Sequence, residues 1–401
     1  MQENKMPIRL LSFLIIFLAL FIVACGGGNS KQTWHPPEPT RAFHMAMTPF
    51  PPDFNDDPGL LTQIVNEVYN KLSTNTDMVA HHFDNGIPWN DALTNTFPYN
   101  NHIMSDWQFR LDSTPSGHKK FIAITPIGPT RDAMALLRDS ADDMPLVAPF
   151  DNHAASGSFN HTDVRTAYLN YCRRVIEFFS PDYIVIGIET NLLRKNTNAS
   201  TWQNYVDLNQ YVYNELKTSY PNLAISVSVS PLEAFEEYIG PPDEFSGDPS
   251  GYAASQIAAM NDVMTSSDYY AIALYPYMST LAASPIPDDL LDRLFALQSS
   301  KPIAIAETGM LAENVTVSNI DFESDETKQA GYMSQLLNKS DEHELIFINW
   351  FIQQDYDDLC AYYGGCSDIQ LLWRDTGLYD GSGNARDALL TWQNYMAREV
   401  E

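Results

Sequence analysis

The chain is poor in basic residues and in cysteine. Its 401 residues include 23 lysines and arginines against 51 aspartates and glutamates, which gives a formal net charge of -28 at pH 7. A surface this acidic repels phosphate backbones, so we expect no nucleic-acid partner, whereas uncharged polymers such as polysaccharides are not repelled. The 4 cysteines and 9 histidines show no spacing typical of a zinc site, so we expect no metal.

Two common catalytic signatures are also missing. No glycine-rich phosphate loop follows an expected strand, and no Gly-x-Ser-x-Gly turn occurs. Chemistry on nucleotides and hydrolysis by a serine nucleophile therefore lack their usual sequence features. We expect a chain that works without a cofactor.

A long apolar run occurs at the N-terminus. It covers residues 10–24 and stops at Cys25. This is the length of a signal-peptide core and short for a spanning helix. A small residue before cysteine at the end of such a run resembles the lipobox of bacterial lipoproteins, which implies acylation of Cys25. We expect a lipoprotein signal peptide over 1–24, a flexible tether over 25–40, and export to the bacterial cell envelope, at the outer membrane or cell surface in preference to the inner membrane. An uncleaved membrane anchor is the alternative.

The remaining cysteines divide into a pair and a single residue. Cys360 and Cys366 lie in one loop with two glycines between them. An oxidising compartment favours a disulfide there. Cys172 lies in an expected helix, where we predict a buried free thiol.

Eight short apolar runs alternate with amphipathic stretches across residues 41–401, which we expect to form one domain. This alternation predicts an α/β fold, and eight strands are the number of a (β/α)₈ TIM barrel. The expected strands cover 43–49, 77–83, 120–126, 182–189, 223–230, 269–276, 302–309 and 344–351. Expected helices cover 60–72, 163–179, 201–220, 328–340 and 385–399.

Two glutamates end otherwise apolar strands. Glu189 ends the fourth expected strand and Glu307 ends the seventh, and active sites of this fold lie at such strand ends. A buried carboxylate is costly unless it is paired or used. Two carboxylates that face one cavity suit cleavage of a glycosidic bond, and their repulsion raises the pKa of one of them. The alternative is a pair of structural ion pairs at the rim.

Polar and aromatic residues end several other strands. Strand alternation allows only one of His81 and His82 to face the barrel interior, and the pattern does not say which; His82 is the candidate that we retain. Our candidates for substrate binding are His82, Asp84, Asn191, Tyr275, Tyr277 and Trp350.

Four segments resemble glycoside hydrolase clan A, and the nearest relatives are the arabinogalactan endo-β-1,4-galactanases of family 53. They are residues 182–191, 269–277, 302–310 and 376–392, within a resemblance over about 43–395. The resemblance implies retaining hydrolysis of β-glycosidic bonds in a polysaccharide or oligosaccharide. It implies an acid/base at Glu189, a nucleophile at Glu307, an aromatic residue touching that nucleophile at Tyr275, and a tryptophan flooring the sugar subsite at Trp350.

The sequence departs from this family at two places. Ile188 precedes Glu189, where the clan has an asparagine that binds the sugar 2-hydroxyl, and Asn191 is the candidate to replace it. The galactanases also carry an arginine on strand two, where this chain has His81 and His82. Because isoleucine cannot form that hydrogen bond, the alternative function is a surface lipoprotein that binds glycans on a glycosidase-like barrel without cutting them.

Overall fold

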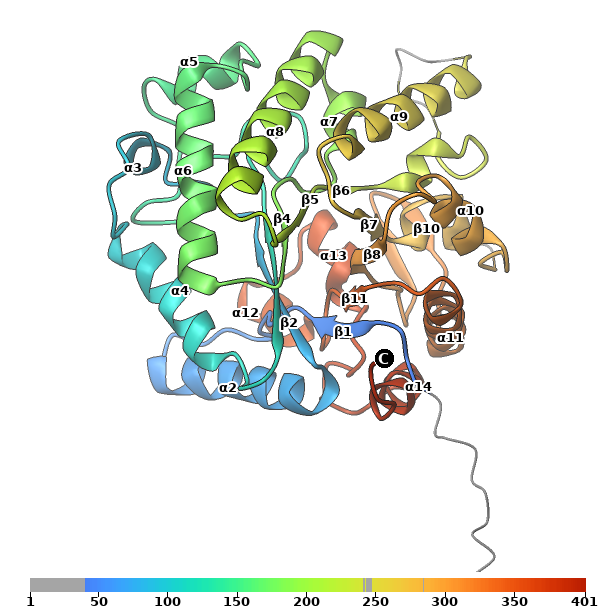
Figure 1. The fold of residues 1–401 in the computed structure, drawn as a ribbon. Coiled ribbons are helices and arrows are strands. Elements are labelled where there is room, and N and C mark those ends of the chain that lie inside the picture. Colours follow the sequence, from blue (N-terminus) through green and yellow to red (C-terminus); the bar gives the residue numbers. More distant parts are fainter. Residues whose placement is uncertain (1–39, 241, 243–246, 284) are drawn as a thin grey trace, which may run out of the picture. The chain divides into compact units, whose positions relative to one another are not determined.

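The computed structural model describes residues 40–240, 242, 247–283 and 285–401. Within this part, helices surround a central parallel sheet (Figure 1). Its strands are β1 (His44–Met47), β2 (Met78–Phe83), β3 (Lys119–Ile124), β4 (Tyr183–Val185), β5 (Ala224–Ser226), β6 (Ser228–Val229), β7 (Tyr270–Leu274), β8 (Ile303–Thr308) and β11 (Phe347–Trp350). The expected signal peptide, Cys25 and nearly all of the tether lie outside the described residues. No described helix is long and apolar enough to cross a membrane.

The central sheet closes into a barrel. The strand order is β5-β4-β3-β2-β1-β11-β8-β7-β6, and every neighbouring pair is parallel. The outermost members, β5 and β6, are separated only by Val227, so they are two parts of one strand. The sheet therefore has eight strands joined in a ring, and the predicted (β/α)₈ barrel is confirmed.

Helices occupy the connections between the strands. They are α2 (Pro58–Asn75), α3 (Trp89–Leu93), α4 (Asn101–Ser113), α5 (Phe150–Ala155), α6 (Thr162–Phe179), α7 (Asn191–Asn196), α8 (Ala199–Ser219), α9 (Pro249–Met264), α10 (Leu290–Ala296), α11 (Glu326–Glu342), α12 (Asp357–Tyr362), α13 (Asp368–Arg374) and α14 (Asp387–Met396). Several begin at a side-chain cap. Asn198 accepts from the Thr201 N–H at 3.0 Å, and Asp325 accepts from the Lys328 N–H at 2.7 Å. The five expected helices correspond to α2, α6, α8, α11 and α14.

The inside of the barrel is filled with side chains. Small residues such as Ala80 and Ala304 alternate there with large rings, and the rings of Phe121 and Phe347 lie 4.7 Å apart. A second and larger apolar core lies between the strands and the surrounding helices. Because the interior is packed, a ligand can enter only at the mouth, where the strands end.

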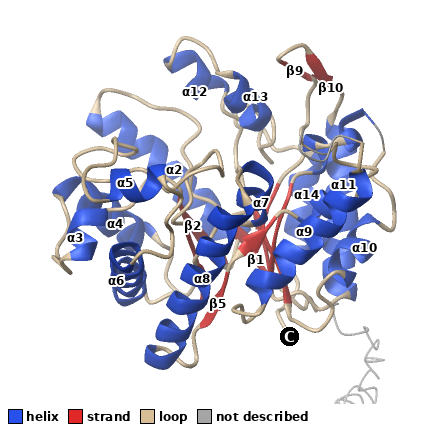
Figure 2. Cartoon of the chain, turned by 90° about the horizontal axis from the view of Figure 1, so that it is seen from above, coloured by secondary structure: helices blue, strands red, loops and turns tan. Residues whose placement is uncertain are grey.

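Two insertions lie at one end of the barrel, opposite the C-terminus (Figure 2). The first is the hairpin of β9 (Val315–Val317) and β10 (Ile320–Phe322), which follows β8. The second contains α12 and α13, which follow β11. Cys360 and Cys366 form the expected disulfide in this second insertion, with their Cα atoms 4.8 Å apart. Cys172 is buried and free, as predicted.

Candidate active site

Glu189 lies just beyond β4, where the chain turns sharply. Its φ of +48° falls in the left-handed region that non-glycine residues seldom adopt. Its backbone N–H donates to Ser228 Oγ at 2.9 Å. Two residues earlier, Gly187 passes so close to the Tyr205 hydroxyl that a Cβ atom would collide with it. This turn leaves the Glu189 side chain 20% exposed at the mouth of the barrel, and such backbone strain is common at functional sites.

Glu307 reaches the mouth through an irregularity in β8. Ile305 pairs with Ile272, but Glu307 pairs with the next residue of β7, Ala273. The extra residue in β8 is a bulge, which re-aims the side chain that follows it. Glu307 is only 4% exposed, and the Tyr275 hydroxyl donates to its Oε2 at 3.1 Å. Its Oε1 is buried and has no hydrogen-bond partner among the described residues, and His82 Nδ1 lies 3.9 Å from it.

The two carboxyl groups interact electrostatically. Burial raises the pKa of Glu307 to about 8, and the negative charge of Glu189 adds to this rise. The Arg131 charge and the Tyr275 hydrogen bond oppose it. The pair therefore retains a proton near neutral pH, as expected for like charges that face a common space.

Arg131 links the two sides of the site, although no pattern in the sequence predicted this role. Its Nη1 donates to Asp84 Oδ2 at 2.7 Å, and its Nη2 lies 3.3 Å from Glu189 Oε2. The side chain is 7% exposed, and its φ is +56°. Arg131 follows β3 by several residues, so a search restricted to strand ends does not reach it. The buried guanidinium holds two carboxylates in place.

His82 and Asp84 lie beside the two glutamates. His82 Nδ1 is 3.9 Å from Glu307 Oε1, and burial lowers the pKa of this imidazole to about 3, so it is neutral. His81 faces the helices instead, with Nε2 2.9 Å from Thr114 Oγ1. Burial raises the pKa of Asp84 to about 6, against the opposing charge of Arg131.

Two expected substrate-binding residues, Trp350 and Asn191, do not reach the mouth, so their predicted placement is wrong. Trp350 is 0% exposed, and its Nε1 donates to the Thr376 carbonyl at 3.0 Å, because it faces the helix layer. Asn191 is also 0% exposed; its amide donates to Gln256 Oε1 at 2.9 Å and its Oδ1 accepts from the Ser230 N–H at 2.7 Å. Tyr277 is 1% exposed but lies beside the site, because its ring is 6.1 Å from the Tyr275 ring and the charge of Glu189 adds to the rise that burial causes in its pKa.

Other aromatic side chains stand where Trp350 was expected. The Phe351 ring lies 5.1 Å from the His82 ring, 5.4 Å from Phe50 and 5.4 Å from Trp373. The Trp373 ring lies 4.4 Å from the Tyr275 ring. Phe50, Phe351 and Trp373 are partly exposed. They form an aromatic wall beside Glu307.

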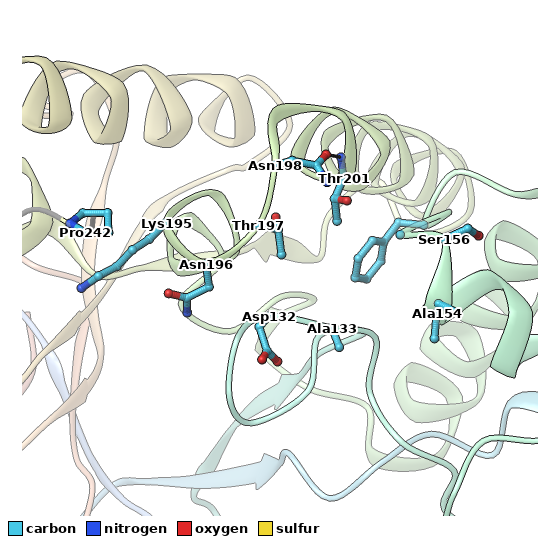
Figure 3. Close-up of a pocket in the computed structure, with 13 residues that line it drawn as sticks. Asp132, Ala133, Ala154, Ser156, Lys195, Asn196, Thr197, Asn198, Thr201 and Pro242 are labelled. Carbon is cyan, nitrogen blue, oxygen red and sulfur yellow. Dashed lines mark hydrogen bonds between the residues drawn. The ribbon is translucent and has the colours of Figure 1, made fainter. Parts of the chain in front are cut away.

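A pocket of about 740 Å³, which we call the polar pocket, lies beside Asp132 and Ala133, the residues that follow Arg131 (Figure 3). Its lining includes Asp132, Lys195, Asn196 and Asn198. The Asn196 amide donates to the Arg131 carbonyl at 3.4 Å, so the pocket adjoins the backbone of the residue whose side chain contacts Glu189. Amide and hydroxyl groups of this kind match the hydroxyl groups of an uncharged sugar.

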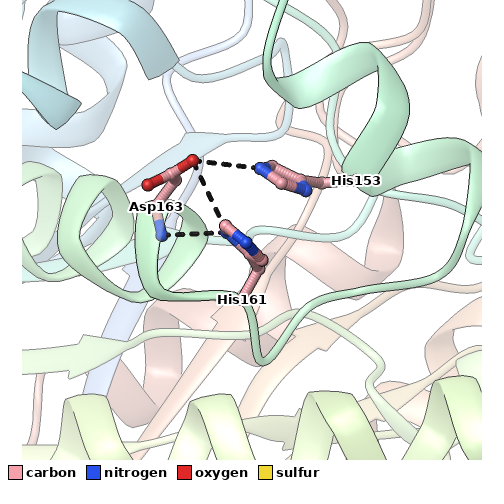
Figure 4. Close-up of side chains that lie close together, drawn as sticks. All are labelled: His153, His161 and Asp163. Carbon is pink, nitrogen blue, oxygen red and sulfur yellow. Dashed lines mark hydrogen bonds and ion pairs between the residues drawn. The ribbon is translucent and has the colours of Figure 1, made fainter.

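Three clusters of described residues could hold a metal ion, and none includes a residue of this site. They are His153–His161–Asp163, Asp292–Glu342–His343 and Glu313–Asp355–Asp375. In the first, His161 Nδ1 accepts the Asp163 N–H at 3.2 Å and His153 Nε2 lies 3.2 Å from Asp163 Oδ2 (Figure 4). The His161 contact caps the start of α6, so this cluster has a structural role.

The raised pKa of Glu307 makes stability depend on pH. Between its ordinary value of 4.5 and about 8, native Glu307 holds a proton that the unfolded chain has released. Stability therefore falls as the pH rises through this window. Glu307→Gln removes this dependence. The free energy of unfolding of the variant minus that of the wild type should therefore be greater at pH 8 than at pH 5, by on the order of 3 kcal/mol. Urea unfolding at both pH values measures this difference, and an equal difference at both would contradict it.

Comparison with known proteins supports the fold. No protein-family model and no curated protein matches the sequence. A solved GH5_18 structure from Bifidobacterium longum subsp. longum ATCC 55813 is similar, with a TM-score of 0.60 and 13% identity over 90% of this chain and 81% of that one. The exo-beta-1,4-mannosidase Op5Man5 from Opitutaceae bacterium strain TAV5 has a TM-score of 0.59 and 12% identity over 92% of this chain, which spans 61% of that protein. A GH5_18 structure from Streptomyces cattleya in complex with GlcNAc has a TM-score of 0.55 and 10% identity, covering 89% of this chain and 80% of that one.

These matches share the barrel with this chain at low sequence identity. None of the three is described as a galactanase, so nearness to the family 53 galactanases stays a prediction. What the three proteins bind or cleave is a property of those proteins.

Proposed function

We propose that the chain is a retaining glycoside hydrolase that cleaves β-glycosidic bonds in an uncharged polysaccharide or oligosaccharide. The observation that supports this most is that Glu189 lies just beyond β4 and Glu307 near the end of β8 at one barrel mouth, close enough for the charge of Glu189 to add to the rise in the pKa of Glu307. The hydrogen bond from Tyr275 to Glu307 agrees with the role that the clan A resemblance implies. The similarity to GH5_18 barrels is consistent with the same chemistry.

In the first step, Glu307 attacks the anomeric carbon while the bond from that carbon to the leaving oxygen breaks. Glu189 donates a proton to the leaving oxygen. In the second step, Glu189 takes a proton from water, and the water oxygen displaces Glu307 from the anomeric carbon. Tyr275 orients Glu307, and Arg131 is a positioning residue for Glu189.

The proton must lie on Glu189 when the bond breaks. In the ligand-free site, burial favours the proton on Glu307. A sugar bound beside Glu307 gains positive charge at its anomeric carbon as the bond breaks, and this charge stabilises the Glu307 carboxylate. The transition state therefore favours the proton on Glu189 and the carboxylate on Glu307.

Two classes of β-linked substrate are candidates. The clan A resemblance implies a β-1,4-galactan, as in an endo-galactanase, whereas the structurally similar Op5Man5 is named an exo-beta-1,4-mannosidase. The acidic composition disfavours a polyanionic substrate.

Ile188 keeps a second candidate function open, which is glycan binding without cleavage. It is fully buried in the barrel interior and cannot donate a hydrogen bond to a sugar hydroxyl. Asn191 does not replace that donor, because its amide is bonded to Gln256 and Ser230. A hydrolase of this design obtains its transition-state stabilisation from other groups.

Membrane attachment through Cys25 stays a prediction, as does location at the outer membrane or cell surface. Mass spectrometry of the mature N-terminus tests the attachment, because acylation adds a lipid to Cys25 and cleavage removes residues 1–24. An unprocessed N-terminus would contradict it.

The deciding experiment is reducing-end release from β-1,4-galactan, β-1,4-mannan and their oligosaccharides. We expect hydrolysis of one of them with retention of the anomeric configuration, which NMR of the first product shows. Inversion would contradict the proposed role of Glu307. Binding without any product release would favour the second candidate function.

A further inference from the structure

Aromatic side chains gather on two neighbouring loops at the mouth of the barrel. One loop joins β1 to α2, and the other follows β11 and contains α12 and α13. We call the set the aromatic strip; its members are Phe50, Phe54, Phe351, Tyr362, Tyr363 and Trp373. All six are partly or fully exposed.

The strip begins at the candidate catalytic pair and runs outward. Its inner part is the wall of Phe50, Phe351 and Trp373 that lies beside His82 and Tyr275. Its outer part is formed by two ring contacts, from Phe54 to Tyr362 at 4.9 Å and from Tyr362 to Tyr363 at 5.0 Å.

A cavity of about 230 Å³ lies between the two loops, beside the inner part of the strip. Its lining includes Phe50, Tyr356, Trp373 and the Cys360–Cys366 disulfide. The two loops are also tied together, because the Leu359 N–H donates to the Pro52 carbonyl at 3.0 Å and the Tyr362 hydroxyl donates to Asp56 Oδ1 at 2.6 Å. These links hold the strip in place before any ligand arrives, which lowers the entropy cost of binding.

The outer rings are unusually accessible. Tyr362 is 39% exposed and Tyr363 is 60% exposed, and a cluster of exposed apolar side chains marks a binding surface. Acidic residues such as Asp56, Asp358 and Asp368 lie on the same two loops, so an anionic ligand is disfavoured. The faces of aromatic rings fit the C–H-rich faces of β-linked sugar rings.

We propose that the aromatic strip binds successive sugar units of an uncharged β-linked glycan, beyond the unit held at Glu307. This inference rests on the proposed function for its choice of ligand. It means that the protein selects chains longer than a disaccharide and that the outer rings set this preference.

The test compares ligands of two lengths on a variant that does not cleave them. In Glu307→Gln protein, calorimetry gives the Kd of β-1,4-mannotetraose and mannobiose, and of the corresponding galactose and glucose oligomers. We expect at least one tetraose to bind about tenfold more tightly than its biose, which corresponds to about 1.4 kcal/mol, because its additional sugar units can stack on the outer rings. Adding Tyr363→Ala, or Tyr362→Ala with Tyr363→Ala, should remove most of this ratio. The matched control is Phe109→Ala, whose ring is 38% exposed on α4, and it should keep the ratio.

The outcomes separate this inference from the proposed function. Tetraose preference that persists in the Tyr363→Ala and double variants would overturn it, as would equal or absent binding of every tetraose and biose. Tighter binding of an anionic oligogalacturonate would also overturn it. If the wild type cleaves a glycan but the ratio never depends on these tyrosines, only the inference fails. If the ratio of the two Kd values depends on Tyr362 and Tyr363 but the wild type cleaves no glycan, the hydrolase proposal fails and the inference about the binding surface stands.

Discussion

Glu307→Gln is expected to lower kcat/KM on the preferred glycan by about 10⁴-fold or more. Glutamine has nearly the same shape as glutamate and keeps an oxygen that can accept the Tyr275 hydrogen bond. It cannot form the glycosyl ester that the proposed first step requires. Initial rates of reducing-end release, measured on purified wild type and variant, give the ratio.

Glu177→Gln is the control for this substitution. Glu177 lies on α6, away from the barrel mouth, with half of its side chain exposed, so its replacement should leave kcat/KM unchanged. The unfolding measurements described for Glu307→Gln show independently that the variant is folded. Retention of more than a tenth of wild-type activity in Glu307→Gln would rule out Glu307 as the nucleophile.

Glu189→Gln is expected to reduce activity in a way that depends on the leaving group. General acid catalysis contributes about 10²–10⁴-fold, so glycan hydrolysis should fall by that factor. A dinitrophenyl glycoside of the same sugar leaves as a stable anion without protonation, so formation of the glycosyl-enzyme from it should fall far less. A pre-steady-state burst of dinitrophenolate, followed by slow turnover, is the expected observation.

Two results would assign Glu189 another role. An equal loss on glycan and on dinitrophenyl glycoside would indicate a defect in sugar binding instead of proton transfer. A loss of folding, seen as a large fall in Tm, would indicate that the ion pair of Glu189 with Arg131 is structural. Glu189→Asp helps to separate these cases, because it keeps the charge near Arg131 but shortens the reach to the leaving oxygen.

The barrel was predictable from the sequence because its strands are short apolar runs with helices between them. All eight expected strands are present, and the expected disulfide follows from two cysteines in one glycine-containing loop. The alternation of apolar and polar residues and the spacing of the cysteines are local properties of the chain, so they can be read from the sequence without knowing the tertiary structure. Those two properties were enough to place Glu189 and Glu307 at strand ends.

Side-chain direction was harder to predict. In β11, Phe347 faces the interior and Ile348 faces the helices, so strand alternation sends Trp350 outward and Phe351 to the mouth. The expectation for Trp350 followed the family resemblance and not this alternation. In β8 the alternation itself fails, because the bulge before Glu307 changes the direction of that side chain.

Arg131 could not be found from a local pattern. It lies in a long connection after β3 and meets Asp84 and Glu189 only because three separate segments converge. Similarly, nothing near Asn191 in the sequence indicates that Gln256 occupies its amide. Such partners are set by tertiary packing.

The packed interior of the barrel restricts which residues can be substituted during evolution. Ile188 and the alanines of neighbouring strands form a solid floor beneath the two carboxylates, so a substitution there disturbs close packing throughout the barrel. The loops that form the aromatic strip and the polar pocket stand above this floor and add little to it. Substitutions in these loops could therefore change which ligand the mouth accepts, while the barrel remained the same.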